Sequence, residues 1–156
     1  MQRLFMDAKD YMKLALKEAQ KAFFEDEVPV GVVIVNATTG QVVAKARNQT
    51  EHGGDPTKHA EMLAIQKACK KMGTKRLWDC DMYVSLEPCT MCAAAISFAR
   101  IEKLFIGATD EKGGAVLNGV RFFESKTCLF KPEVYEGVLA EESQKLLKDF
   151  FKNKRS

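Results

Sequence analysis

The stretch DMYVSLEPCTMCAAAI, residues 81–96, carries the pattern that decides the fold. Its first part, DMYVSL, is rich in apolar residues that suit a strand, and its second part is rich in small residues that suit a helix. Pro88 lies between the two parts, and proline is favoured in the first turn of a helix. The stretch therefore predicts a strand over residues 81–86 that leads into a short helix from Pro88 to about residue 100.

The same alternation extends outward in both directions. Upstream, residues 57–72 predict a helix that Asp55 caps, with Pro56 in its first turn and Gly73 at its end. The other predicted segments are a helix over 7–24, a buried strand over 28–36, an edge strand over 41–47, strands over 103–108 and 133–139, and a final helix over 140–154. Strands separated by helices indicate a layered α/β domain with a mixed sheet.

Composition and charge narrow the class of protein. With 46% apolar and 29% charged residues among 156, the chain is an ordinary globular sequence, and we expect residues 1–156 to form one domain. No apolar run is long enough for a signal peptide or a membrane span. Five cysteines, an odd number without an export signal, indicate reduced thiols in the cytoplasm. The net charge of +3 permits a nucleic-acid partner without requiring one.

Metal-binding side chains occur in two segments that each follow a predicted strand or loop and enter a helix. KHAEMLA, residues 58–64, contains His59, and EPCTMCAAA, residues 87–95, contains Cys89 and Cys92. Residues three apart on a helix share one face, so both sulfurs can bind the same ion. One imidazole and two thiolates form a three-ligand zinc set whose fourth tetrahedral position is open to water.

The same side chains also have plainer interpretations. Cys89 and Cys92 could be a thiol redox pair, part of a closed structural zinc site, or two small buried residues. A lone histidine at a helix start, like His59, is more often a surface or core residue than a ligand. Three further cysteines have no short spacing to this group, and the sequence indicates no role for them: Cys69, Cys80 and Cys128.

Glu61 favours the catalytic interpretation over the structural one. Two thiolates and a neutral imidazole cancel the formal charge of zinc, which weakens its power to acidify a bound water. A nearby base is then needed. Glu61 lies two residues after His59, in the same predicted first turn, and its carboxylate can reach the water without binding the metal. The two helix N-termini would favour thiolate and hydroxide at this point.

These residues match a known pattern. HAE together with PCTMC fits H-x-E followed by P-C-x-x-C, so the chain resembles the zinc-dependent nucleobase deaminases. The segments that resemble the branch acting on adenosine in bacterial tRNA are EVPVGVVIV, DPTKHAEMLAI, MYVSLEPCTMCAAAI, GATDEKGGA and PEVYEGVLAEESQKLLKDFF. The resemblance implies a three-layer α/β/α cytidine-deaminase-like fold with a mixed five-stranded sheet. It also implies a homodimer.

The resemblance further implies a reaction and its site. His59, Cys89 and Cys92 would hold one zinc ion per subunit, without an organic cofactor. Glu61 would transfer protons while adenosine at the wobble position of a tRNA anticodon loop is hydrolysed to inosine and ammonia. The substrate base would have to be unpaired or extruded from a duplex.

Substrate contacts are implied at matching positions in the same segments. Asn48 would hydrogen-bond the base edge or the ribose, Val30 and Leu86 would form apolar walls, and Asp110 with Lys112 would contact the ribose–phosphate backbone. Each has an alternative as a turn, core or surface residue. The terminal KDFFKNKRS combines aromatic and basic residues, which suits single-stranded RNA but also suits an ordinary helix end.

Three other functions remain open at the level of sequence. The nearest is a deaminase of free guanine, cytosine or a nucleoside, which would share every zinc-binding residue. A zinc-stabilised nucleic-acid-binding module would instead need a fourth protein ligand. A thiol redox protein would use Cys89 and Cys92 without a metal.

Overall fold

The computed structural model describes residues 6–155, except for the side chain of Arg155. Residues 1–5, which belong to the segment judged free of a targeting signal, lie outside the described residues, and so does Ser156 at the end of KDFFKNKRS. The elements are α1 (Ala8–Phe24), β1 (Gly31–Asn36), β2 (Val42–Arg47), α2 (Ala60–Met72), β3 (Cys80–Leu86), α3 (Thr90–Ala99), β4 (Lys103–Ala108), the 3-10 helix η1 (Phe122–Glu124), β5 (Glu133–Tyr135) and α4 (Ala140–Arg155).

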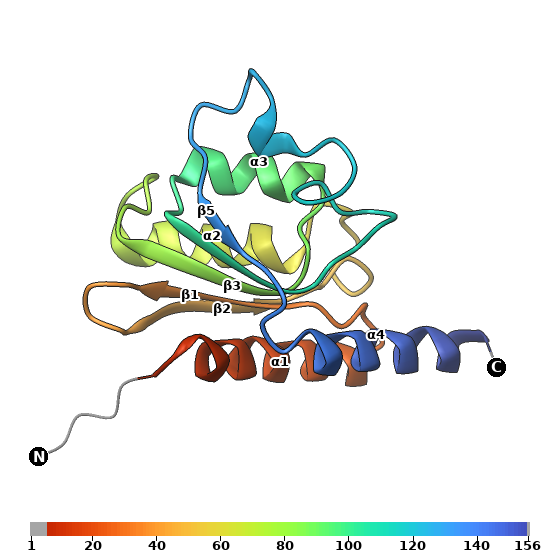
Figure 1. The fold of residues 1–156 in the computed structure, drawn as a ribbon. Helices are drawn as coiled ribbons and strands as arrows, with labels where there is room; N and C mark the ends of the chain where they lie inside the picture. Colours follow the sequence, from red (N-terminus) through yellow and green to blue (C-terminus); the bar gives the residue numbers. More distant parts are fainter. Residues whose placement is uncertain (1–5, 156) are drawn as a thin grey trace, which may run out of the picture.

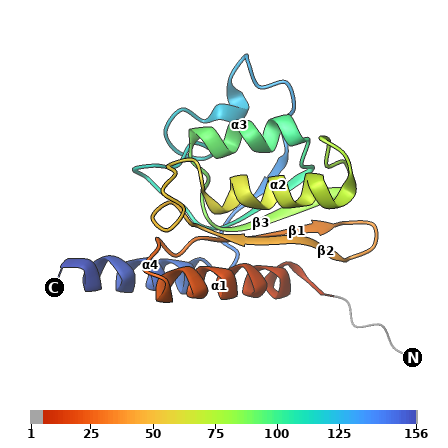
Figure 2. The same cartoon turned by 180° about the vertical axis from the view of Figure 1, so that it is seen from behind.

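The five strands form one mixed sheet in the order β2-β1-β3-β4-β5. β1 is antiparallel to both β2 and β3, whereas β3, β4 and β5 are parallel to one another. Helices α1 and α4 cover one face of the sheet, and α2 and α3 cover the other (Figures 1 and 2). The predicted three-layer α/β/α fold with a mixed five-stranded sheet is therefore confirmed, with β2 as the predicted edge strand.

Helix α1 packs closely against the first strand. A capping box starts it: the Asp7 side chain accepts a hydrogen bond from the Asp10 backbone amide, and the Asp10 side chain accepts one from the Asp7 backbone amide. The buried face of the helix includes Met12 and Ala15. A Cβ on Gly31 would collide with the Ala15 carbonyl, so this close approach depends on glycine at the start of β1.

The two helices next to the metal-binding segments begin later than the sequence predicts. The Asp55 side chain does not cap α2; it accepts hydrogen bonds from the Thr57 amide and hydroxyl, which closes a turn before the helix. His59 is the N-cap of α2, with extended dihedral angles of −71° and 150°. Cys89, at −74° and 177°, is likewise the N-cap of α3, and Pro88 stays outside that helix.

The later part of the chain is also less regular than predicted. Residues 120–125 contain the short helix η1, and the fifth strand is limited to Glu133–Tyr135 instead of residues 133–139. Helix α4 nevertheless docks at a defined place, because the Ser143 hydroxyl donates to the Ser85 carbonyl near the end of β3. Phe150 of α4 also packs edge-on against Phe23, with ring centroids 5.8 Å apart. Helix α4 is therefore anchored beside the carboxyl end of β3.

Among residues 6–155, no helix combines the length and the apolar character that a membrane span requires.

Candidate metal centre and substrate cavity

The structure brings together the three predicted metal ligands. The His59 Nδ1 atom lies 3.6 Å from the Cys89 sulfur and 3.6 Å from the Cys92 sulfur. All three ligand atoms are within 4.8 Å of one another. A tetrahedral zinc ion bonded at about 2.0 Å to nitrogen and about 2.3 Å to sulfur sets these atoms about 3.6 Å apart. The donor set therefore fits zinc in both chemistry and spacing.

The backbone around these ligands favours negative charge. His59 and Cys89 are N-caps, and Cys92 lies in the first turn of α3, so both helix N-termini face the three donors. A hydrogen bond from Cys92 and the neighbouring His59 lower the pKa of Cys89 to about 4, although burial opposes the shift. The pKa of Cys92 is raised by its hydrogen bond to the Cys89 sulfur and by burial. A bound metal ion would take both sulfurs as thiolates.

Glu61 lies beside the ligands at the start of α2. It is only 4% exposed, and burial raises the pKa of its carboxyl group to about 7. The Cys89 charge raises this pKa as well, whereas His59 lowers it. A carboxyl group in this environment can accept a proton and release it again without a large energetic penalty in either direction.

A cavity of about 300 Å³ opens next to the ligands. This volume lies at the small end of the range for ligand pockets, roughly 300–1,000 Å³. The cavity is lined by seven residues that the sequence singled out: Val30, Asn48, His59, Glu61, Leu86, Cys89 and Asp110. Four other lining residues were not predicted: Val28, Thr50, Glu87 and Gly113. The only sequence signal for them is their position next to predicted site residues.

Of the predicted pair, Asp110 lines both the cavity and a second hollow, whereas Lys112 lines the second hollow. Asp110 lines the cavity, and its Oδ1 atom accepts hydrogen bonds from the backbone amides of Lys112 and Gly113. Lys112 is exposed and borders a second hollow of about 730 Å³. The other residues that line this hollow are Val28, Leu86, Asp110, Leu147, Lys148, Phe151 and Lys152. The second hollow thus joins the cavity to helix α4.

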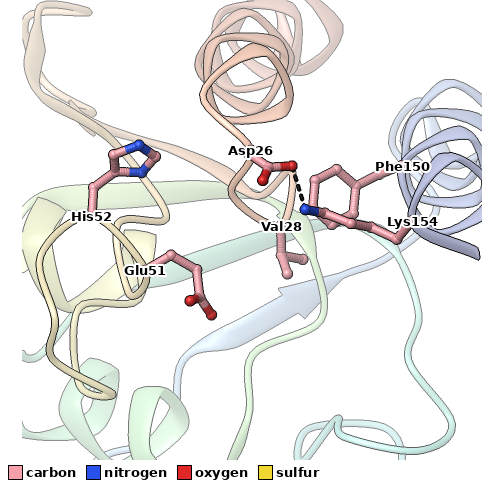
Figure 3. Close-up of a pocket in the computed structure, with 6 residues that line it drawn as sticks. All are labelled: Asp26, Val28, Glu51, His52, Phe150 and Lys154. Atoms are coloured by element: carbon pink, nitrogen blue, oxygen red, sulfur yellow. Dashed lines mark ion pairs between the residues drawn. The ribbon is translucent and has the colours of Figure 1, made fainter.

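A third hollow, of about 480 Å³, is also lined by Val28. Figure 3 shows Glu51 and His52 on one side of it and Phe150 and Lys154 of α4 on the other. Lys154 pairs with Asp26 at 2.5 Å, at the edge of this hollow (Figure 3). Val28 lines all three hollows, so they lie next to one another around this residue.

Comparison with known proteins gives consistent matches. The family model of the cytidine and deoxycytidylate deaminase zinc-binding region matches residues 6–108. The tRNA-specific adenosine deaminase of Agrobacterium fabrum is 52% identical over 145 residues, 93% of this chain and 94% of that protein. The protein of the same name from Rickettsia bellii is 49% identical over 144 residues, 92% of this chain and 99% of that protein.

A solved structure supports the same likeness. It comes from studies of A-to-I editing by tRNA deaminases at the wobble position of transfer RNA. Its TM-score is 0.85 at 52% sequence identity, and the match covers 88% of this chain and 98% of that chain. The likeness therefore extends well beyond the metal-binding residues.

Proposed function

This chain belongs to the cytidine and deoxycytidylate deaminase family of zinc-binding proteins, and on that premise we propose that it is a tRNA-specific adenosine deaminase. In this proposal, residues 1–156 form one deaminase domain that hydrolyses adenosine to inosine at the wobble position of an anticodon loop. One observation carries the proposal: three side chains fit a zinc ion, no fourth protein ligand joins them among residues 6–155, and Glu61 lines the cavity beside them. This arrangement suits hydrolysis better than a closed structural site.

His59, Cys89 and Cys92 would hold the zinc ion. When bound, zinc supplies a Lewis acid that makes water nucleophilic near neutral pH. Glu61 accepts a proton from the attacking water and delivers it to the ring nitrogen beside the attacked carbon of adenine. Glu61 then moves the remaining hydroxyl proton to the departing amine, so that adenosine and water become inosine and ammonia. One buried carboxyl group can perform both transfers in sequence.

The cavity walls would hold the base. Val30 and Leu86 present apolar surface to its faces, and Asn48, which is 7% exposed, offers an amide for its edge or ribose. Asp110 and Lys112 would contact the ribose–phosphate backbone outside the cavity. Asp110 lines both the cavity and the adjoining hollow, and Lys112 lines that second hollow, which supports a ligand that continues from one hollow into the next.

An anticodon loop is the partner that this surface favours. Single-stranded RNA is bound through aromatic stacking and through neutralisation of phosphates by cations. Phe151, Lys148 and Lys152 border the hollow beside the cavity, and Lys154 borders the third hollow. A wobble base is already unpaired in the loop, which suits a cavity this small.

We place one zinc ion in each subunit and propose a cytoplasmic homodimer. Large apolar side chains are exposed around the end of α3, among them Trp78, Phe98 and Leu129, at 50%, 60% and 81% exposure. Apolar surface of this kind suits a subunit interface. Light scattering should give twice the chain mass of 17.5 kDa, and metal analysis should give one zinc ion per chain.

The function can be tested by comparing ammonia release from an RNA substrate with ammonia release from free bases and a free nucleoside. The zinc-loaded protein should release ammonia from a synthetic anticodon stem-loop with adenosine at the wobble position, and much less from free guanine, cytosine or adenosine. Glu61→Ala should retain zinc and abolish release, because the ligands remain but the proton carrier is lost. Faster release from a free base than from the stem-loop would assign the protein to the free-base deaminases instead.

A further inference from the structure

Two buried carboxylates next to the cavity have no part in the proton transfers described above. Glu27 is 0% exposed and Glu87 is 3% exposed. A charged side chain is rarely buried this completely unless its charge is satisfied by partners. In both residues, the partners are backbone amides of a loop that forms part of the cavity wall.

Glu87 gathers the loop that follows β4. Its two oxygens accept five hydrogen bonds of 2.8–3.1 Å. The donors are the backbone amides of Asp110, Val116, Leu117 and Asn118 and the side-chain amide of Asn118. Residues 109–118 contain neither helix nor strand, so this carboxylate replaces the hydrogen bonds that regular structure would provide.

The sequence of this loop fits its approach to Glu87. A Cβ on Gly114 would collide with the Glu87 carboxylate and would lie 2.5 Å from the Asp110 carbonyl oxygen. Glycine is therefore required where the loop passes over the carboxylate. Asp110 and Gly113, the two loop residues that line the cavity, lie immediately before this point.

Glu27 holds the opposite loop in the same way. Its oxygens accept hydrogen bonds from the backbone amides of Glu51 at 3.0 Å and His52 at 2.7 Å, and Oε2 lies 2.7 Å from the His52 ring. This loop leaves the edge strand β2 and carries Asn48 and Thr50 into the cavity wall. The side chains of Glu51 and His52 extend outward from it to the neighbouring hollow (Figure 3).

We propose that Glu27 and Glu87 are positioning residues that fix the two loop walls of the cavity before the substrate binds. The proposal rests on the proposed deaminase function for its substrate, but its physical basis is the hydrogen bonding of the loops. A wall that is already ordered does not lose conformational freedom when the RNA binds, so affinity is gained without any added contact. The metal ligands and Glu61 lie at helix starts, outside these two hydrogen-bonded segments.

This separation predicts an unequal effect on KM and kcat. Glu27→Gln and Glu87→Gln retain side-chain size, but each replaces one acceptor oxygen with an amide group that faces N–H donors. The loops should loosen, and KM for the anticodon stem-loop should rise about tenfold. The kcat of zinc-loaded protein should change less than about threefold, because Glu61 and the metal ligands keep their helices.

A third buried carboxylate provides a matched control. Glu18 is 5% exposed and pairs with Lys21 and Arg47, but it lies on α1 and does not line the cavity. Glu18→Gln should lower thermal stability and leave KM unchanged. If all three variants show the same KM as the unaltered protein, Glu27 and Glu87 only stabilise the fold and the proposal is wrong.

Amide hydrogen exchange tests the proposal without any substrate. In the unaltered, zinc-loaded protein, the amides of Glu51, His52, Val116, Leu117 and Asn118 should exchange slowly, and each glutamine variant should lose protection only in its own loop. Rapid exchange of these amides in the unaltered protein would overturn the proposal even if a variant fails to fold. Inactivity of the unaltered protein on every RNA would instead count against the proposed function, while the exchange result would still decide the loop anchoring.

Discussion

The two ends of β3 each carry a buried carboxylate, and they differ in how its charge is accommodated. Glu87, just beyond the carboxyl end, accepts five hydrogen bonds from the loop around it. Asp81, near the amino end, is 9% exposed, and its Oδ1 atom has no hydrogen-bond partner among residues 6–155. The comparison shows that burial alone does not mark a functional carboxylate. The satisfied carboxylate lies at the end of the sheet where the metal ligands gather.

The pKa values of Glu87 and Asp81 reflect this difference in hydrogen bonding. Burial raises the pKa of Glu87, but the hydrogen bonds from Asp110, Asn118 and the adjoining amides outweigh it and bring the pKa below its usual value. Burial raises the pKa of Asp81 to about 6, with Lys103 opposing the shift and Glu102 adding to it. The charge on Glu87 is thus stabilised in the fold, whereas the charge on Asp81 destabilises it.

Among the proposed substitutions, loss of the Glu87 side chain should lower the free energy of unfolding most. Glu87→Ala leaves the buried amide of Val116 and the partly buried amide of Leu117 without acceptors, and unsatisfied buried groups cost about 1–3 kcal/mol each. The free energy of unfolding should fall by about 3 kcal/mol or more, as measured by urea denaturation of the zinc-loaded protein. A loss under about 1 kcal/mol would show that water can replace the carboxylate and would remove the contrast with Asp81.

A single methyl group should damage the same region. Gly114→Ala places a Cβ against the Glu87 carboxylate and the Asp110 carbonyl, so the loop has to move away. We expect a loss of about 2 kcal/mol in the free energy of unfolding, together with a raised KM for RNA. Gly54→Ala is the control: its Cβ would meet nothing within 4 Å, although its φ of +59° adds a small strain. Gly114 itself does not have a positive φ, so a loss no larger than that of Gly54→Ala would show that the loop moves away from Glu87 at little cost and would contradict the prediction.

Neutralising Asp81 should raise the free energy of unfolding, in contrast to the two substitutions above, and the size of this gain should depend on pH. Its pKa in the folded protein, about 6, lies above the unfolded value of about 3.9, so the penalty for burying its charge is complete above pH 6 and absent below pH 4. Relative to the unaltered protein, Asp81→Asn should therefore gain about 2 kcal/mol between pH 4 and pH 8. Unfolding curves at the two pH values measure this difference. A gain that is the same at both pH values would show that burial does not raise the pKa of Asp81 above its unfolded value.

The smallest effect should come from Lys103, which faces Asp81 in the β3–β4 register. Lys103→Met removes the positive charge that opposes the shift of Asp81, so the pKa of Asp81 should rise slightly further, by a few tenths of a unit. Carboxyl-carbon NMR titration of the two proteins would measure the change. An unchanged or lower pKa would mean that the charge of Lys103 does not stabilise the Asp81 carboxylate.

The local motifs were the part of the site that could be predicted from sequence. His59, Glu61, Cys89 and Cys92 lie within short segments whose spacing is tied to metal chemistry, and the structure places them together. Asn48, Val30, Leu86 and Asp110 were expected only through the family resemblance, and they line the same cavity. The order and type of most elements followed from apolar periodicity, which reports burial directly.

The start of α2 and the roles of Glu27 and Glu87 could not be predicted, because the apolar periodicity of the sequence does not report turn hydrogen bonds or contacts between distant segments. The start of α2 was predicted too early because Asp55 closes a turn with Thr57, and a turn and an N-cap use the same residue types. Glu27 and Glu87 were not singled out because acidic residues are usually exposed. Each of them binds a loop that is distant in sequence. The loop bound by Glu27 lies 24 or more residues away, and the loop bound by Glu87 lies 23 or more residues away.

Inosine mapping is the most direct test of the hydrolytic site. A purified tRNA pool that lacks inosine would be incubated with the zinc-loaded protein and with its Glu61→Gln variant, and every adenosine would then be assayed for conversion. The expected result is inosine at the wobble position of an anticodon loop with the unaltered protein and none with the variant. Unchanged adenosine in every tRNA, or equal conversion by a zinc-loaded Glu61→Gln protein, would contradict it.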